Sequence, residues 1–397
     1  FRLEGRAQFL MGCQTYWGQN GSVTARSPAA FARDFRQMRG LGLRWTRCFV
    51  PFKTEEDKRI SDAIVQLAQK HGIVLYHTPN LYNTADPAEL AAQRATAREI
   101  AERYKGVPGL AVDICNEPSF KADDAGLQKA FGREGKSTGR WDDLGVAAFW
   151  RCMADAQRAW ARGNREGVRE GDPARLASVG FSQGWAGGPS MKDPILASLD
   201  LDFTDRHYYG RPSGLDAELR DVDLRGLGKP LVLGECGAKD HPTFKAMDPW
   251  GMGDDDASYD RRFLALGHHT FGLGASVLSS WHLRDPMEGI FPCGILHQTG
   301  VPRPTALIMR AMALAFGRLK AKPVTPSVYL VLPDAGRMGG GREEVIRAFH
   351  RASDLLVSCR VDFGLLPDSA LDRIPAGTKA LVYPLPLDPS DAVVERL

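Results

Sequence analysis

Short apolar runs alternate with longer amphipathic stretches from residue 9 to about residue 320, and this alternation constrains the fold more than any other feature of the chain. Strands and helices that alternate many times are typical of βα units around a parallel sheet. Eight strands, helices between them and a last helix at Thr305–Leu319 predict a (β/α)8 barrel over residues 1–321. The expected strands are Phe9–Tyr16, Leu43–Val50, Ile73–Pro79, Leu110–Glu117, Leu176–Phe181, Phe203–Tyr209, Leu231–Cys236 and Ala275–Trp281.

A second, smaller α/β rhythm follows a proline-containing linker at Lys322–Pro326. Residues 322–397 are predicted to form a small Rossmann-like or flavodoxin-like domain. Its expected elements are strands at Val328–Leu332, Val361–Leu365 and Ala380–Tyr383 and a helix from about Glu343 to Leu356. The last residues read as a helix start with no strand after it, so we expect this domain to be incomplete and the native chain to continue past Leu397. The chain opens at Phe1 and not at Met, which indicates removal of a leader, an initiator or a tag, or trimming.

Charge and cysteine usage exclude several classes of protein. The 51 Lys and Arg residues stand against 48 Asp and Glu, a net charge of +3, and the basic residues form no block, so no nucleic-acid partner is expected. No apolar run reaches the roughly 18–20 residues of a membrane span. The seven cysteines are an odd number without a CxxC pair, so neither metal nor cofactor is predicted. A secreted or periplasmic location is favoured over a cytoplasmic one.

Two glutamates stand at the ends of predicted strands that open on the same mouth of the barrel. Glu117 closes the fourth strand within Asn116-Glu117-Pro118, and Glu235 closes the seventh after Gly234. The carboxyl ends of barrel strands carry the functional residues. Glycoside hydrolysis needs two carboxyl groups flanking the bond. Mutual repulsion is expected to raise the pKa of one of them, and we assign that acid role to Glu117.

These motifs resemble the retaining glycoside hydrolases of the clan with catalytic Glu on strands four and seven. The nearest pattern is glycoside hydrolase family 5, the cellulases and mannanases. The resemblance extends to the ends of other strands, at Arg47, His77, His207-Tyr208-Tyr209 and Trp281. It implies that Glu235 is the nucleophile, that Glu117 is the acid/base, and that the substrate is an oligo- or polysaccharide with β-linkages.

The same resemblance assigns roles to the neighbours of the two glutamates. It implies that Arg47 and Tyr209 hold and polarise Glu235, and that His77 and His207 line the subsite where the bond breaks. Trp281 would form the floor beneath that sugar. Asn116 would bond the sugar 2-hydroxyl. Apart from the resemblance, the aromatic residues Tyr16 and Trp17 at the end of the first strand are candidates for stacking on further sugars, with closure of the barrel mouth as the alternative.

The domain after the linker resembles the amidotransferase-like domain appended to some β-galactosidases. That resemblance implies a packing or homo-oligomerisation role. No chemistry is predicted in this domain, because its Cys359 precedes a strand and does not stand on a strand-to-helix elbow.

Plainer interpretations stay open for each residue. Asn116 and Glu117 are also the residue types that cap a following segment, and Arg47 is also able to form a structural ion pair with Asp113. His77, His207, Tyr209 and Trp281 each have a core-packing alternative. The alternative functions are a catalytically inactive carbohydrate-binding barrel and a metal-dependent barrel hydrolase. The second is disfavoured because the first strand carries no His.

Overall fold

A computed structural model gives the structure of the chain. It describes residues 2–3, 6–16, 27–121, 124–132, 143–184, 192–237, 256–285, 293–319, 325–338, 341–386, 389 and 391–397. Trp17 falls outside these ranges, as do Trp141, Trp185, Trp250 and most of the Lys322–Pro326 linker.

Eight parallel strands close into a barrel in the order β10-β3-β4-β5-β6-β7-β8-β9. Each predicted strand is present, with bounds that agree to within two residues at either end, so the barrel prediction is confirmed. The strands are β3 (Leu10–Tyr16), β4 (Trp45–Phe49), β5 (Val74–Thr78), β6 (Leu110–Asn116), β7 (Leu176–Phe181), β8 (Thr204–Tyr208), β9 (Leu231–Cys236) and β10 (Val277–Ser280).

The barrel interior is filled by side chains in two zones. The lower zone is an apolar cluster that includes Trp45, Tyr76, Phe203 and Val277. Because successive side chains of a strand point to opposite faces, every second residue of each strand faces inward. The next inward residues toward the carboxyl ends are polar and include Arg47 and His207, which are fully buried. The apolar zone therefore forms a solid floor beneath a polar mouth.

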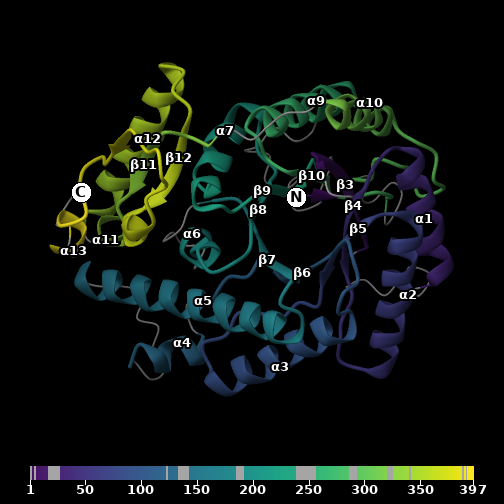
Figure 1. Cartoon of the computed structure of the whole chain (residues 1–397), viewed down its shortest axis with the longest axis horizontal. Coiled ribbons are helices and arrows are strands. Elements are labelled where there is room, and N and C mark those ends of the chain that lie inside the picture. The colour runs from purple at the N-terminus through teal and green to yellow at the C-terminus, as the bar shows by residue number, and fades with distance from the viewer. Residues whose placement is uncertain are drawn as a thin grey trace.

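Helices surround the barrel (Figure 1). Residue types that favour helix ends mark where they begin and end. Thr54 forms a capping box at the start of α2, and Gly72 closes that helix at φ 58. The surrounding helices include α1 (Pro28–Gly40), α2 (Glu55–His71), α3 (Pro87–Arg103), α5 (Asp143–Gly171), α6 (Pro194–Ser198), α7 (Pro212–Arg220), α9 (Asp256–Gly272) and α10 (Pro304–Arg318). The last of these matches the predicted final helix.

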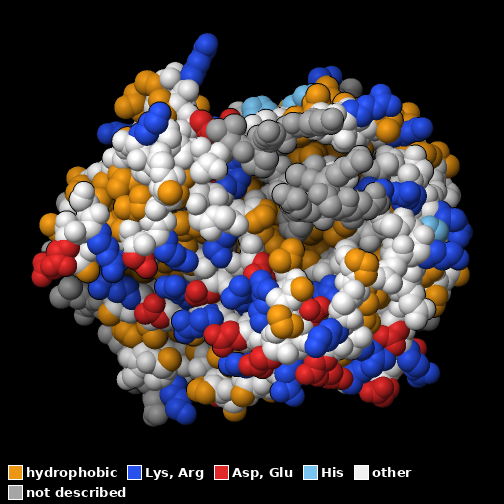
Figure 2. All heavy atoms as spheres, in the orientation of Figure 1, with side chains coloured by type: hydrophobic (Ala, Val, Ile, Leu, Met, Phe, Trp, Pro, Cys, Tyr) orange, Lys and Arg blue, Asp and Glu red, His pale blue; other side chains and the backbone are white. Residues whose placement is uncertain are grey.

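The long helix α5 lies against α3 along one edge of the molecule, where Figure 2 shows basic and acidic side chains interleaved. Arg94 of α3 lies 3.0 Å from Glu166 of α5 and also pairs with Glu170. Exposed pairs of this kind contribute little to stability. They do balance the charge of this face, in line with the scattered basic residues of the sequence.

Residues 325–397, which we call the C-terminal unit, contain a separate three-stranded sheet. β11 (Val328–Leu332) lies between β12 (Phe363–Pro367) and β13 (Ala380–Val382), and all pairs are parallel. The unit also contains α11 (Asp334–Arg337), α12 (Arg342–Ser358), the 3-10 helix η3 (Asp368–Arg373) and α13 (Asp391–Val394). It lies beside α6 and α7 of the barrel (Figure 1).

The C-terminal unit and the barrel share one apolar core. Leu330 and Leu365 of the unit belong to the same buried cluster as Leu219 and Val222 next to the barrel. The backbone N–H of Leu365 also donates to the carbonyl oxygen of Asp223 at 3.1 Å. The boundary between the two parts is therefore packed as a core.

A few described elements were not expected from the sequence. A two-stranded hairpin, β1 (Arg2–Leu3) with β2 (Arg6–Ala7), precedes the barrel. A short helix, α4 (Ala125–Ala130), lies within the segment that follows β6. Among the described helices, none is long and apolar enough to cross a membrane.

Candidate active site

Arg47 lies at the centre of the polar mouth and contacts carboxylates on two other strands. From β4, its Nε and one terminal nitrogen lie 2.7 and 2.6 Å from Asp113 Oδ2 on β6. The other terminal nitrogen lies 2.9 Å from Glu235 Oε2 on β9. Arginine suits this position because its planar group presents several donors in fixed directions and stays protonated. The two alternatives for Arg47, structural ion pair and partner of Glu235, are therefore both realised.

Glu235 is held by donors on both carboxylate oxygens. Arg47 reaches Oε2, and the Tyr209 hydroxyl donates to Oε1. The residue is only 6% exposed. Fixed donors on a buried carboxylate restrict its rotation and stabilise its ionised form.

Glu117 is the more accessible of the two glutamates. Its side chain is 33% exposed, against 8% for Glu235. Its backbone is left-handed, with φ 48, and its N–H donates to the carbonyl oxygen of Gly180 at 2.7 Å. A non-glycine residue rarely adopts this conformation, and such strain is concentrated at functional sites. The turn directs the Glu117 side chain over the barrel mouth.

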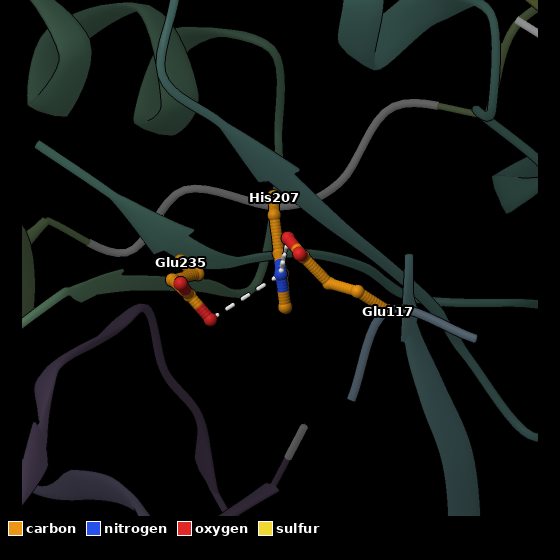
Figure 3. A group of neighbouring side chains, drawn as sticks. All are labelled: Glu117, His207 and Glu235. Atoms are coloured by element: carbon orange, nitrogen blue, oxygen red, sulfur yellow. Dashed lines mark hydrogen bonds and ion pairs between the residues drawn. The ribbon is translucent and has the colours of Figure 1, made fainter. Parts of the chain in front are cut away.

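His207 lies between the two glutamates (Figure 3). Its Nδ1 is 2.7 Å from Glu117 Oε1 and 3.3 Å from Glu235 Oε2. Its Nε2 is 3.0 Å from Arg47, which can only donate, so Nε2 accepts and Nδ1 carries the hydrogen. One carboxylate oxygen of each glutamate and a His207 nitrogen all lie within 4.8 Å of one another.

The pKa directions of the two glutamates differ from the expected ones. Burial raises the pKa of Glu235, and the nearby Glu117 adds to this, while His207, Arg47 and Tyr209 oppose it. Burial also acts to raise the pKa of Glu117, but the hydrogen bond from His207 and the positive charge of Arg47 outweigh it, and the pKa falls. The expectation that repulsion would raise the pKa of Glu117 is therefore corrected, because it took no account of the His207 donor.

Gly180 of β7 lacks a side chain at the point where His207 and Arg47 pack against the backbone. A Cβ atom there would lie 2.5 Å from His207 Nε2 and 2.9 Å from a terminal nitrogen of Arg47. The Gly180 N–H also donates to Asp113 Oδ1 at 3.2 Å, and Thr78 donates to Asp113 Oδ2 at 2.8 Å. Only glycine fits so close to these two buried side chains.

Two further predicted residues lie at the same mouth. Asn116 Oδ1 accepts a hydrogen bond from Arg47 at 2.8 Å, which fixes the orientation of its amide. Trp281, 5% exposed, packs with Cys293 and Tyr209 in a small apolar cluster. Seven of the predicted site residues therefore lie together at the mouth: Arg47, Asn116, Glu117, His207, Tyr209, Glu235 and Trp281.

His77 is not part of this group, which corrects the expectation that it lines the subsite. Its Nε2 is 2.8 Å from the hydroxyl of Ser61 on α2, and its ring packs near Phe52 and Tyr104. Within β5 it is Tyr76 and Thr78 that face inward, so the residue between them faces the helices. Tyr16 ends β3, but its side chain lies outside the described residues, as does Trp17.

Sequence reasoning missed several residues near the site. Asp205 of β8 is 3% exposed, and neither of its carboxylate oxygens has a hydrogen-bond partner among the described residues. Lys192 and Gln183 come from the segment between β7 and α6. No local signal singled out Asp205, which stands among other polar residues in Thr204-Asp205-Arg206-His207. Lys192 and Gln183 gave none, because a single polar residue in a loop is ordinary.

Glu117, His207 and Glu235 also form the one group among the described residues with ligand atoms close enough to hold a metal ion. Two carboxylates and an imidazole are acceptable ligands for zinc. However, Arg47 donates to both Glu235 and His207, and its fixed positive charge opposes a cation at that point. The donor set fits a site that handles protons better than a metal centre.

No protein-family model and no curated protein matches the sequence. Solved structures nevertheless resemble the chain. GH5_18 from Streptomyces cattleya, in complex with GlcNAc, has a TM-score of 0.66 at 14% identity and covers 96% of this chain and 99% of its own. A β-galactosidase from the psychrophilic Marinomonas ef1 has a TM-score of 0.69 at 14% identity, covering 98% and 74%. Exo-β-1,4-mannosidase Op5Man5 from Opitutaceae bacterium strain TAV5 has a TM-score of 0.63 at 18% identity, covering 96% and 74%. The chain therefore has the (β/α)8 barrel fold of these glycoside hydrolases.

Proposed function

We propose that the protein is a retaining glycoside hydrolase that cleaves β-linked glycosides by double displacement. The observation that carries the proposal is the approach of the two glutamates, with one carboxylate oxygen of each within 4.8 Å across His207. Retaining enzymes place their carboxyl groups about 5–5.5 Å apart, whereas inverting enzymes leave about 6.5–9.5 Å for a water molecule. The short separation supports direct attack by one carboxylate on the sugar.

The environment of each glutamate supports the division of roles. Glu235 is deeper and receives donors from Arg47 and Tyr209, which oppose the rise that burial causes in its pKa and so favour the charge that a nucleophile requires. Glu117 is more exposed and its partner is a histidine, which exchanges protons near neutral pH. The raised pKa of Glu235 and the lowered pKa of Glu117 favour a proton on Glu235 when the site holds no sugar. The two carboxyls lie close enough to titrate together, and the productive form is the one that carries the shared proton on Glu117.

In the first step, a Glu235 oxygen attacks the anomeric carbon as the bond to the leaving oxygen breaks. The leaving oxygen takes the proton of Glu117, and a glycosyl ester forms on Glu235. In the second step, Glu117 takes a proton from water, whose oxygen attacks the anomeric carbon. The ester bond breaks and its electron pair returns to Glu235. Two inversions give net retention.

Other residues of the mouth would position the sugar. The Asn116 oxygen accepts from Arg47, so its amide nitrogen is the group that would donate to the sugar 2-hydroxyl. The aromatic faces of Tyr209 and Trp281 suit the apolar C–H face of a pyranose. Named ligands and activities of the similar structures include GlcNAc, Manβ1-4GlcNAc, β-galactosidase and exo-β-1,4-mannosidase, so β-mannosides and β-galactosides are the first substrates to test.

The experiment is a screen of aryl β-glycosides and β-linked oligosaccharides with the full chain, with the product anomer followed by NMR. A 2-deoxy-2-fluoro glycoside of the best sugar should label Glu235, as located by peptide mass spectrometry. Glu235→Gln should abolish turnover, while the surface variant Glu170→Gln should behave as the unchanged protein. An inverted product or a label on another residue would contradict the proposal.

The alternative function is a carbohydrate-binding barrel without catalysis. In that case the unchanged protein would bind a sugar of the screen in a calorimetric titration and would turn over none of the substrates. Turnover by the unchanged protein that is lost in Glu235→Gln would exclude this alternative.

A further inference from the structure

A buried arginine of the C-terminal unit reaches into the barrel side of the molecule. Arg337 of α11 is fully buried. Its terminal nitrogen lies 2.8 Å from Asp193 Oδ2, next to α6 of the barrel, and 2.7 Å from Asp334 Oδ1. Its Nε donates to the same Asp334 oxygen at 2.8 Å. The hydrogen bond to Asp334 orients the buried guanidinium, and the contact with Asp193, which is an ion pair and not a hydrogen bond, holds its end beside the start of α6.

Asp193 pairs with Arg337 and also caps the first turn of α6, so it links Arg337 to the start of that helix. Its Oδ1 accepts hydrogen bonds from the N–H groups of Ile195 and Leu196 at 3.2 and 3.0 Å, which caps the helix, and its Oδ2 faces Arg337. The helix has only five residues. A helix this short is not stable by itself, and its position therefore depends on tertiary contacts with the rest of the protein.

One branch of contacts leads from Asp193 to the acid/base. The backbone N–H of Asp193 donates to Gln157 Oε1 on α5. The Gln157 amide nitrogen in turn donates to the carbonyl oxygen of Pro118 at 3.4 Å. Pro118 follows Glu117 directly, at the turn where the backbone is left-handed. Gln157 is fully buried, so water does not compete with these bonds.

A second branch leads from the same place to the nucleophile. Lys192, the neighbour of Asp193, donates from Nζ to the carbonyl oxygens of Ser182 and Gln183 at 2.8 Å each. Gln183 Oε1 accepts the backbone N–H of Tyr209 at 2.6 Å. The Tyr209 hydroxyl then donates to Glu235. Both branches begin at the residues that Arg337 anchors.

We propose that Arg337 is a positioning residue for the active site, through which the C-terminal unit holds both catalytic glutamates in register. This rests on the proposed hydrolase function for its kinetic consequence. The C-terminal unit then positions residues of the active site, in addition to any role in homo-oligomerisation. Misplacement of reacting groups by about 1 Å costs up to about 100-fold in rate, so the loss of this anchor is expected to act mainly on kcat.

The test compares two contacts between the C-terminal unit and the barrel side of the chain. Arg337→Gln removes the anchor. His350→Gln is the matched control, because His350 Nε2 lies 3.3 Å from Asp221 Oδ2, beyond the end of α7 and outside both branches. We expect Arg337→Gln to lower kcat by about 10- to 100-fold with a smaller change in KM. His350→Gln should change kcat less than about twofold.

Amide hydrogen exchange supplies a readout that does not depend on turnover. In Arg337→Gln, the N–H groups of Asp193 and Tyr209 should exchange at least tenfold faster, and in His350→Gln they should not. Asp193→Asn is the second variant, for use if Arg337→Gln does not fold, since Asn keeps the helix cap but loses the charge pair. It should reproduce the loss of kcat and the faster exchange at Tyr209.

The outcomes separate the two proposals. If the unchanged protein turns over no glycoside, the proposed function fails, and exchange at Tyr209 still decides whether Arg337 anchors the site. If the protein is active and a folded Arg337→Gln or Asp193→Asn matches His350→Gln in kcat and in Tyr209 exchange, the positioning role is overturned. Partial recovery of kcat in Arg337→Lys would support the role of the charge.

Discussion

Arg47 and Glu235 lie 2.9 Å apart inside the barrel, and the same guanidinium lies 2.6 Å from Asp113, so one cation balances two buried carboxylates. Neither Arg47 nor Asp113 has any exposed side-chain surface. A buried pair is costly to break, because removal of one partner leaves the other charged and unpaired. The stability of the fold and the ionisation of the proposed nucleophile therefore depend on the same side chain.

Arg47→Met should lower the free energy of unfolding by about 3–5 kcal/mol, as measured by urea denaturation. It should also raise the pKa of Glu235, because burial already raises that pKa and Arg47 opposes it. Glu235 must be ionised to attack, so the acidic limb of the kcat/KM profile should move to higher pH. Arg59→Met, on the exposed face of α2, should stay within about 0.5 kcal/mol. An unmoved acidic limb would argue against Glu235 as the nucleophile.

Glu117→Gln should act according to the leaving group. For a sugar or alkyl leaving group, which needs a proton, we expect kcat/KM to fall by about 10²–10⁴-fold. For a dinitrophenyl glycoside, which leaves without protonation, the first step should change little and the glycosyl ester should accumulate. Burst kinetics on the two substrates provide the measurement. An equal loss with both leaving groups would show that Glu117 is not the acid.

Gly180→Ala should disturb the site from the backbone. The added Cβ would meet His207 Nε2 at 2.5 Å, so the imidazole and Arg47 must shift. Overpacking of this kind costs about 1–3 kcal/mol of stability, and kcat should fall with it. Gly317→Ala is the matched control, because a Cβ at that position of α10 meets nothing within 4 Å. There, Ala in place of a helical Gly should stabilise by roughly 0.5–1 kcal/mol. Thermal unfolding and steady-state kinetics of both variants test this contrast.

Asp205 makes the stability of the protein depend on pH. Burial raises its pKa to about 7, above the value of about 3.9 expected in the unfolded chain. The folded state therefore holds this proton more tightly, and Asp205 lowers the free energy of unfolding progressively as pH rises from about 4 to about 7. Asp205→Asn should remove that loss, with a gain at pH 8 relative to pH 4 of at most about 4 kcal/mol. Denaturation of both proteins at pH 4 and pH 8 measures the difference. If the free energy of unfolding changes equally between the two pH values in both proteins, Asp205 has no such effect.

The barrel was predictable because its signals are local. Buried parallel strands such as Leu231–Cys236 read as continuous apolar runs, and prolines and glycines mark the ends of the helices between them. The two glutamates were predictable for the same reason, since Glu117 directly follows β6 and Glu235 is the next-to-last residue of β9. Most of the predicted mouth, including Arg47 and His207, is brought together by strand order alone.

The rest depended on information that the sequence does not carry locally. His77 stands near a strand end, as the residues of the candidate site do. Because successive side chains of a strand point to opposite faces, His77 points toward α2, while its neighbours Tyr76 and Thr78 point into the barrel. The pKa direction of Glu117 depended on which donor reached it. Gln157 and Lys192 owe their positions to contacts with residues far along the chain, as does Arg337, and no spacing rule identifies such partners.

The apolar cluster that runs without interruption from the barrel into the C-terminal unit has a consequence for how the chain comes apart. Two parts joined by a continuous hydrophobic interior should melt together, so calorimetry is expected to record a single endotherm and not two. A protein shortened before Lys322 would expose the wall that Leu330 and Leu365 now cover, and it should precipitate instead of surviving as a free-standing barrel.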